Sequence, residues 1–191
     1  MIFTALRQLS NHLGYPPRFL EVGTYAGNTL HSARLANELS ELVTIDLDIP
    51  LLFEGQSVQD RFEIAKLRDK NVKSTGSKLI VEDSLTLDWN KLGKFDLIFI
   101  DGDHNIPRVD IDIYNAIKSL NKNGILIIDD IQKFSLIHFL FRNINTELRL
   151  MSVEEFRRVI DFDTTLFAKT FGLTHFLDPK FFLMCTNFRY K

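Results

Sequence analysis

The sequence predicts an α/β fold, a doubly wound and mostly parallel sheet of seven strands that ends in an antiparallel hairpin. Short apolar runs alternate with helix-like segments over the first 130 residues. This alternation is typical of a parallel sheet covered by helices on both faces. After Asp130 the pattern changes to a helix-rich segment and two further β-like runs. No repeat or linker divides the sequence, so we expect a single domain over residues 1–191.

Five short apolar runs, each ending at acidic residues or glycine, are the expected parallel strands: Arg18 to Val22, Leu42 to Asp46, Lys78 to Val81, Phe95 to Ile100 and Ile125 to Ile128. The clearest expected helix runs from Val109 to Leu120, with Pro107 before it and Gly124 after it. Another helix is expected around Leu30 to Leu39. The runs Thr164 to Lys169 and Phe181 to Thr186 predict the hairpin.

The composition excludes several classes of partner. The 23 Lys and Arg nearly balance the 25 Asp and Glu, so no overall basic field exists to hold a nucleic acid. No stretch approaches the roughly 18 apolar residues of a membrane span, and the first residues lack a secretion signal. We therefore expect a cytoplasmic protein with neither a nucleic-acid nor a membrane partner.

Phenylalanine is concentrated near the end of the sequence, where 11 of the 17 follow Asp130. One interpretation is a core around the hairpin and a helix expected over Phe134 to Ile144. The other is an apolar face that forms a homodimer or a pocket for a small-molecule acceptor. The sequence leaves both interpretations open.

The first expected strand runs into a glycine turn, Glu21 to Thr29, where Gly23 and Gly27 allow the backbone to approach a ligand. A dinucleotide site would need a third glycine, and Glu21 places a carboxylate where phosphates would lie. The turn thus favours a positively charged nucleoside without phosphates, such as S-adenosylmethionine, whose carboxylate could use the helix N-terminus and the Thr29 hydroxyl. The alternative is a packing turn between strand and helix.

Acidic residues at the ends of the next two strands complete this candidate site. Asp46 lies 23 residues after Gly23, where a carboxylate is suited to hold the ribose hydroxyls. Asp48 is the competing candidate for this role, unless it is only a solvated acid of the loop. Asp83 can accept a hydrogen bond from the adenine amino group, with support from Ser84. The alternative is that Asp83 and Ser84 only cap the following turn.

The fourth and fifth strands end at Asp101 and at the pair Asp129 and Asp130, which adjacent strands would bring together. Oxygen ligands of this kind suit Mg²⁺ or another hard divalent cation. The alternative is that these acids cap turns and that Asp101 lies near the sulfonium. His104 follows Asp101 by three residues and is a candidate general base for a hydroxyl nucleophile.

Four motifs in this order resemble the class I S-adenosylmethionine-dependent methyltransferases: Glu21 to Thr29, Leu42 to Asp46, Phe95 to His104 and Ile127 to Asp130. The nearest likeness is to the small catechol and caffeoyl-CoA O-methyltransferases and to bacterial relatives with an Ile-Asp-Gly-Asp-His loop. The resemblance implies a Rossmann-like fold, with cofactor contacts at Glu21, Gly23, Tyr25, Thr29, Asp46, Asp83 and Asp101. It also implies metal ligands at Asp101, Asp129 and Asp130.

Two positions depart from the catechol type, which usually has lysine at His104 and asparagine at Asp130. The sequence therefore predicts methyl transfer from S-adenosylmethionine to a small-molecule hydroxyl, assisted either by a metal or by His104. One alternative is a non-catalytic S-adenosylmethionine-binding module. Another is an NAD-linked oxidoreductase, which the missing third glycine disfavours.

Overall fold

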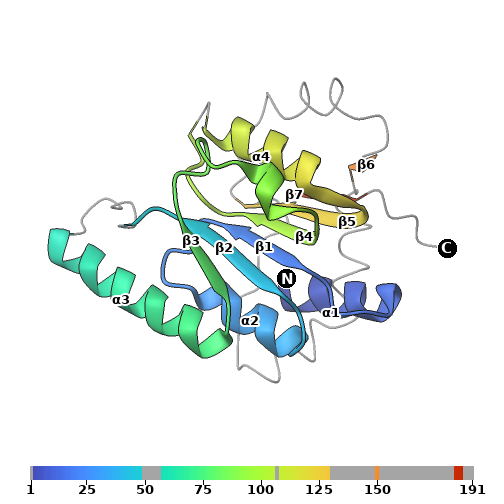
Figure 1. Ribbon diagram of the computed structural model, residues 1–191, viewed down its shortest axis with the longest axis horizontal. Helices are drawn as coiled ribbons and strands as arrows, with labels where there is room; N and C mark the ends of the chain where they lie inside the picture. Colours follow the sequence, from blue (N-terminus) through green and yellow to red (C-terminus); the bar gives the residue numbers. More distant parts are fainter. Residues whose placement is uncertain (1, 49–56, 106–107, 130–148, 151–182, 187–191) are drawn as a thin grey trace.

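The computed structural model describes residues 2–48, 57–105, 108–129, 149–150 and 183–186, and it forms an α/β fold built on one sheet (Figure 1). The strands are β1 (Phe19–Val22), β2 (Leu42–Asp46), β3 (Lys78–Val81), β4 (Phe95–Ile100), β5 (Leu120–Ile128), β6 (Arg149–Leu150) and β7 (Leu183–Thr186). Their order across the sheet is β3-β2-β1-β4-β5-β7-β6. The first five strands pair in parallel, whereas β7 runs antiparallel to β5 and β6. The predicted mostly parallel sheet is confirmed.

Helices cover both faces of this sheet. In Figure 1, α1 (Ile2–Leu13), α2 (Asn28–Ala36) and α3 (Val58–Thr75) lie on one side and α4 (Arg108–Ser119) on the other. Helix α1 was not assigned from the sequence, although its buried residues Ile2, Ala5, Leu6 and Leu9 follow helical spacing. A short 3₁₀ helix, η1 (Trp89–Leu92), precedes β4.

The boundaries differ from the prediction mainly around β5. This strand begins at Leu120, five residues earlier than expected, and follows α4 without an intervening residue. The pairing of β5 with β4 is irregular between Leu120 and Ile125. Gly124 lies in this stretch, where a Cβ would be only 2.8 Å from the Leu120 side chain. The expected hairpin strand Thr164 to Lys169 lies outside the described residues, as do Pro107 and the expected helix over 134–144.

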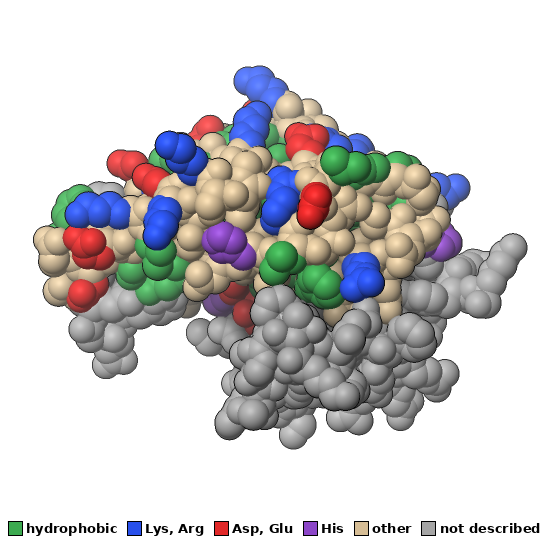
Figure 2. All heavy atoms as spheres, turned by 90° about the horizontal axis from the view of Figure 1, so that it is seen from below, with side chains coloured by type: hydrophobic (Ala, Val, Ile, Leu, Met, Phe, Trp, Pro, Cys, Tyr) green, Lys and Arg blue, Asp and Glu red, His purple; other side chains and the backbone are tan. Residues whose placement is uncertain are grey.

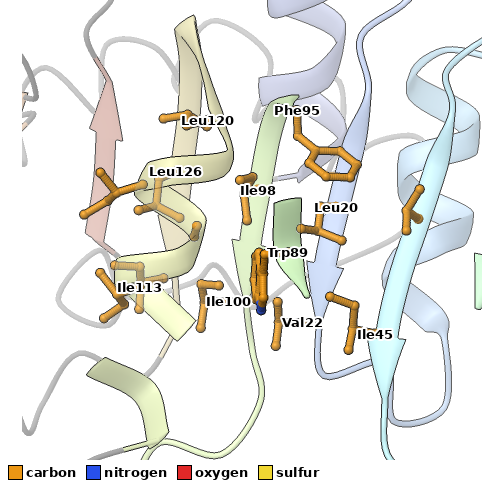
Figure 3. Close-up of a cluster of buried hydrophobic side chains, with 14 of the residues drawn as sticks. Leu20, Val22, Ile45, Trp89, Phe95, Ile98, Ile100, Ile113, Leu120 and Leu126 are labelled. Carbon is orange, nitrogen blue, oxygen red and sulfur yellow. The ribbon is translucent and has the colours of Figure 1, made fainter. Parts of the chain in front are cut away.

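Two clusters of buried side chains form the core, one on each face of the sheet. Leu20, Ile98 and Ile113 belong to the cluster between the sheet and α4, where Trp89 also packs (Figure 3). Phe19, Leu97 and Phe99 point to the other face and pack with α1 and α2. Residues alternate between the two faces along β1, so Glu21 points to the same side as Phe19.

The surface of the described part is mixed in charge. On the face seen in Figure 2, basic and acidic side chains are interspersed rather than gathered by sign. None of the helices in the described ranges combines the length and the apolar character needed to cross a membrane.

Candidate functional site

The glycine turn after β1 is built around a close approach of two strand ends. Gly23 has φ +92°, and a Cβ there would lie 2.6 Å from the Gly102 Cα, in the loop after β4. Tyr25 and Gly27 also have positive φ, 47° and 76°. The turn therefore needs glycine at position 23 for space as well as for conformation.

Glu21 lies beneath this turn and is 1% exposed. The Thr44 hydroxyl donates a hydrogen bond to its Oε2 at 3.0 Å, and the Thr29 hydroxyl also bonds to its carboxyl group. Burial raises the pKa of Glu21 to about 8, with Asp101 and Asp46 adding to the effect. At neutral pH the carboxyl is protonated, so the expected negative charge at this position is absent.

Asp46 organises the end of β2. Its Oδ2 accepts the Tyr25 N–H and its Oδ1 accepts the Leu47 N–H, both at 2.9 Å. Burial raises the pKa of Asp46, against the lowering effects of the Leu47 N–H and of Arg68. The carboxylate thus joins the glycine turn to β2 while remaining at the cavity described below.

Helix α3 holds these loops in place through side chains that the sequence analysis did not identify. Arg68, 3% exposed, donates to the Leu47 carbonyl at 2.7 Å and lies 3.5 Å from Asp46 Oδ2. Asn71 donates to the Ala26 carbonyl at 2.8 Å. Helix α3 is polar along most of its length, so no local sequence signal distinguishes these two residues from its exposed ones.

A cavity of about 320 Å³ opens at the carboxyl ends of β1, β2, β3 and β4, where ligands bind in sheets of this kind. Predicted residues on its lining are Gly23, Tyr25, Asp46, Asp83, Ser84, Asp101 and His104. Other lining residues, not predicted, include Glu82, Asp103, Asn105, Arg108 and Asp112. Among the residues that the structure describes, Glu21, Gly27, Thr29 and Asp129 are not part of this lining.

Asp83 and Arg108 close one end of the cavity. The Arg108 guanidinium donates to both Asp83 oxygens, at 3.3 and 3.2 Å, and its Nε lies 3.6 Å from Asp103 Oδ2. The Leu85 N–H donates to Asp83 Oδ1 at 3.0 Å. The Leu85 contact agrees with the alternative that Asp83 caps the following turn, whereas the sequence analysis did not anticipate the contacts with Arg108.

Asp112, in the second turn of α4, is 2% exposed and lines the same end. Burial raises the pKa of Asp112 to about 6; a hydrogen bond from Ser84 opposes this shift, while the charges of Asp83 and Asp103 add to it. Its position one helical turn after Arg108 on the same helix face places both side chains at the cavity.

Asp101 and His104 lie together at the end of β4. His104 Nε2 is 3.8 Å from Asp101 Oδ1, beyond hydrogen-bond distance but close enough for electrostatic attraction. The Asp129 N–H donates to the Ile100 carbonyl at 2.9 Å, so the ends of β4 and β5 are adjacent as predicted. Asp130 lies outside the described residues, and within those residues no three metal-ligating side chains come together.

Known proteins resemble this chain in sequence and in fold. A curated relative, an uncharacterised protein of Acanthamoeba polyphaga mimivirus, is 27% identical over 118 residues, covering 61% of this chain. The matched segment spans about half of that relative's length, 52%.

Solved structures show the same fold at low identity. The plantazolicin methyltransferase BpumL, in complex with a triazolic desmethylPZN analogue and S-adenosylhomocysteine, has a TM-score of 0.59 at 13% identity, covering 96% of this chain and 81% of its own. A putative caffeoyl-CoA O-methyltransferase from Staphylococcus aureus has a TM-score of 0.52 at 15% identity, with the same coverages. An S-adenosylhomocysteine-bound methyltransferase of Podospora anserina has a TM-score of 0.52 at 16% identity, covering 95% and 75%.

The model of a family described as "Methyltransferase domain" matches residues 20–131, which contain β1 from its second residue, β2 to β5 and every described residue of the cavity. This match covers more than half of the chain and includes the four motifs on which the resemblance rests. The chain therefore belongs to this family, within the class I S-adenosylmethionine-dependent methyltransferases.

Proposed function

We propose that this protein transfers a methyl group from S-adenosylmethionine to the hydroxyl of a small molecule, as one domain over residues 1–191 with a seven-stranded sheet. The observation that supports this most is the cavity itself, where Asp46 from the end of β2 meets Asp101 and His104 from the loop after β4. Its carboxylates are suited to a ligand that offers hydroxyl and amino donors and a positive charge.

The cofactor residues of the proposal are divided between two roles. Asp46 accepts from the ribose hydroxyls, Gly23 and Tyr25 supply backbone beside the ligand, and Asp83 and Ser84 lie at the base end. Glu21, Gly27 and Thr29 support the turn from below.

In the proposed reaction the protein must align the acceptor oxygen with the methyl carbon and the sulfur. When bound, S-adenosylmethionine supplies a methyl group on a sulfonium sulfur, which leaves as a neutral thioether. The His104 imidazole takes the hydroxyl proton as the oxygen forms its bond to carbon. Asp101, 3.8 Å away, stabilises the resulting imidazolium.

A divalent cation bound by Asp101, Asp129 and Asp130 is the second candidate means of activating the hydroxyl, by lowering its pKa. The adjacency of the β4 and β5 ends favours it, because Asp101 and Asp129 follow neighbouring strands. In this version His104 is not required as the base.

Activity measured in EDTA and in Mg²⁺ with wild type, His104→Ala and Asp129→Asn separates the two mechanisms. Activity that survives EDTA and is lost in His104→Ala supports the imidazole base. Activity that needs Mg²⁺, together with a Mg²⁺-induced rise in Tm that Asp129→Asn removes, supports the metal.

Binding of S-adenosylhomocysteine, measured by calorimetry, tests the cofactor assignment. We expect wild type to bind S-adenosylhomocysteine and not NAD, and Asp46→Ala to lose about 1.5–3 kcal/mol of binding free energy. Equal affinities of the two proteins would reject Asp46 as the ribose ligand. A protein that binds the cofactor but methylates nothing in a panel of phenols, sugars and hydroxy acids would instead be a non-catalytic binding module.

A further inference from the structure

Asp112 is the one buried carboxyl group on the described cavity lining that the proposed reaction does not use. It is 2% exposed, and its Oδ1 has no hydrogen-bond partner among the described residues. A buried oxygen without a donor costs free energy, which a ligand that offers an N–H would recover. Rotation about the Cβ–Cγ bond exchanges the two carboxyl oxygens, so either can serve such a donor.

The neighbours of Asp112 show which part of a ligand lies there. Ser84 lies in the loop after β3, and its hydroxyl donates a hydrogen bond to the Asp112 carboxyl group. Asp46 lies at the end of β2, the next strand in the sheet, and both residues line the same cavity. With the ribose at Asp46, the base of a nucleoside extends toward β3 and α4.

Asp83, which the sequence suggests as the acceptor for an adenine amino group, is already engaged. Arg108 donates to both of its oxygens, and the Leu85 N–H donates to Oδ1. Its carboxylate therefore anchors Arg108 at the start of α4. Glu82 also lines the cavity but is exposed to solvent, so Asp112 is left as the buried acceptor with unused capacity at this end.

We propose that Asp112 selects the base of the cofactor, as the acceptor for the exocyclic amino group of adenine. This inference rests on the proposed use of S-adenosylmethionine. A 6-oxo purine presents an oxygen at the same position, and two facing acceptors repel each other without a shared proton. Ser84 acts through Asp112 as a positioning residue, since its hydroxyl holds the carboxyl group.

The test compares binding of S-adenosylhomocysteine with that of its 6-oxo analogue, S-inosylhomocysteine, by calorimetry. Wild type should prefer the 6-amino ligand by about thirtyfold or more, within the range for a buried hydrogen bond to a charged acceptor. Asp112→Asn should reduce this preference to about threefold or less, because the amide can donate to the 6-oxo oxygen. Asp110→Asn removes a carboxylate from the same helix without touching the cavity lining, and it should keep the wild-type preference.

The outcomes separate this inference from the proposed function. If wild type binds neither ligand, the proposed function fails. If wild type prefers S-adenosylhomocysteine and Asp112→Asn retains that preference, the role of Asp112 is wrong while the proposed function stands.

Ser84→Ala provides a second variant should Asp112→Asn not fold. Loss of the orienting hydroxyl should reduce the preference for the 6-amino ligand severalfold, with less effect on the 6-oxo ligand. An equal loss for both ligands would assign Ser84 a merely structural role and overturn the selection mechanism.

Discussion

Glu21 shows how one buried carboxyl group can link the fold to pH. Its pKa of about 8 in the folded protein lies above the ordinary value of 4.5, because burial disfavours the charged form. Between these two values the unfolded chain releases a proton that the folded chain retains. The free energy of unfolding therefore falls as pH rises through this window, and the loss is complete above the folded pKa.

Glu21→Gln removes this titration while keeping the shape of the side chain. We expect the variant and wild type to be equally stable near pH 4.5. Above this pH wild type should lose up to about 1.4 kcal/mol relative to the variant for each further pH unit, until about pH 8. Urea unfolding at several pH values measures the difference. Parallel stability curves for the two proteins would show that Glu21 ionises normally in the fold.

Of the glycines that the structure describes, Gly23 has the least room for an added Cβ atom. We expect Gly23→Ala to lose roughly 4 kcal/mol or more, because its Cβ would meet the backbone of Asp101 and Gly102 in addition to requiring φ +92°. Gly14→Ala is the matched control, since Gly14 also has positive φ, at +72°, but has open space around it. The control should lose only about 1–2 kcal/mol in thermal or urea unfolding. Similar losses in both variants would mean that conformation alone requires glycine at position 23.

Helix α3 stabilises the loops after β1 and β2 through the hydrogen bonds of Arg68 and Asn71. None of its residues is among the described residues that line the cavity. Arg68→Met keeps the apolar stem and removes the guanidinium. The Leu47 carbonyl then loses its hydrogen-bond donor, and Asp46 loses the positive charge beside it. We expect a loss of about 3 kcal/mol in stability, and weaker S-adenosylhomocysteine binding through displacement of the Asp46 loop.

Lys66→Met is the control on the same helix. Lys66 pairs with Glu63 at the surface, where water and salt screen the ion pair and it contributes little to stability. Urea unfolding and calorimetry should show little change for this variant. An unchanged affinity in Arg68→Met, alongside reduced stability, would limit α3 to a role in folding.

The elements that the sequence predicted well are those with strong local patterns. The apolar runs ending at Asp46, Asp83 and Asp101 mark the strands, and the order of these acids along the chain places them at one edge of a parallel sheet. Helix α1 and the early start of β5 were missed. The first has helical periodicity and ends directly before Gly14, so its pattern was present in the sequence but was not used. The second begins with Leu120 and three polar residues, whose strand geometry depends on pairing of Leu120 with Phe95.

The parts of the site that escaped prediction depend on contacts between distant residues. Arg68 meets Asp46 across 22 positions in the chain, and Arg108 meets Asp83 across 25. Nothing local distinguishes Asp112 from Asp110, yet only Asp112 of these two lines the cavity. The burial that keeps Glu21 protonated likewise arises from packing of whole elements, so the sequence indicated a charged group where the fold has a neutral one.

For the molecule as a whole, the cavity is rich in acidic residues although the chain is nearly neutral. The basic groups on its described lining are the guanidinium of Arg108 and the imidazole of His104. Six carboxyl groups lie on the same lining, those of Asp46, Glu82, Asp83, Asp101, Asp103 and Asp112. S-adenosylmethionine carries one more positive charge than S-adenosylhomocysteine in nearly the same shape. Their relative affinity should therefore depend on salt.

We expect the affinity for S-adenosylmethionine to fall more steeply than that for S-adenosylhomocysteine as salt increases from about 0.05 to 0.5 M, where the screening length shortens severalfold. Calorimetry at both salt concentrations measures the ratio of the two dissociation constants. Glu63→Gln, at an exposed position of α3, should leave the salt dependence of this ratio unchanged. A ratio independent of salt would show that the carboxyl groups of the cavity are largely protonated or paired when the ligand binds.

The junction at which α4 passes directly into β5 limits how the length of this chain can vary during evolution. One inserted residue between Ser119 and Leu120 would turn the helix by about 100° relative to the strand, or would reverse which side chains of the strand face each layer. Either change would move Arg108 and Asp112 away from the cavity or turn the Ile125 to Ile128 side chains out of their layers. Homologues should therefore exclude insertions at this junction.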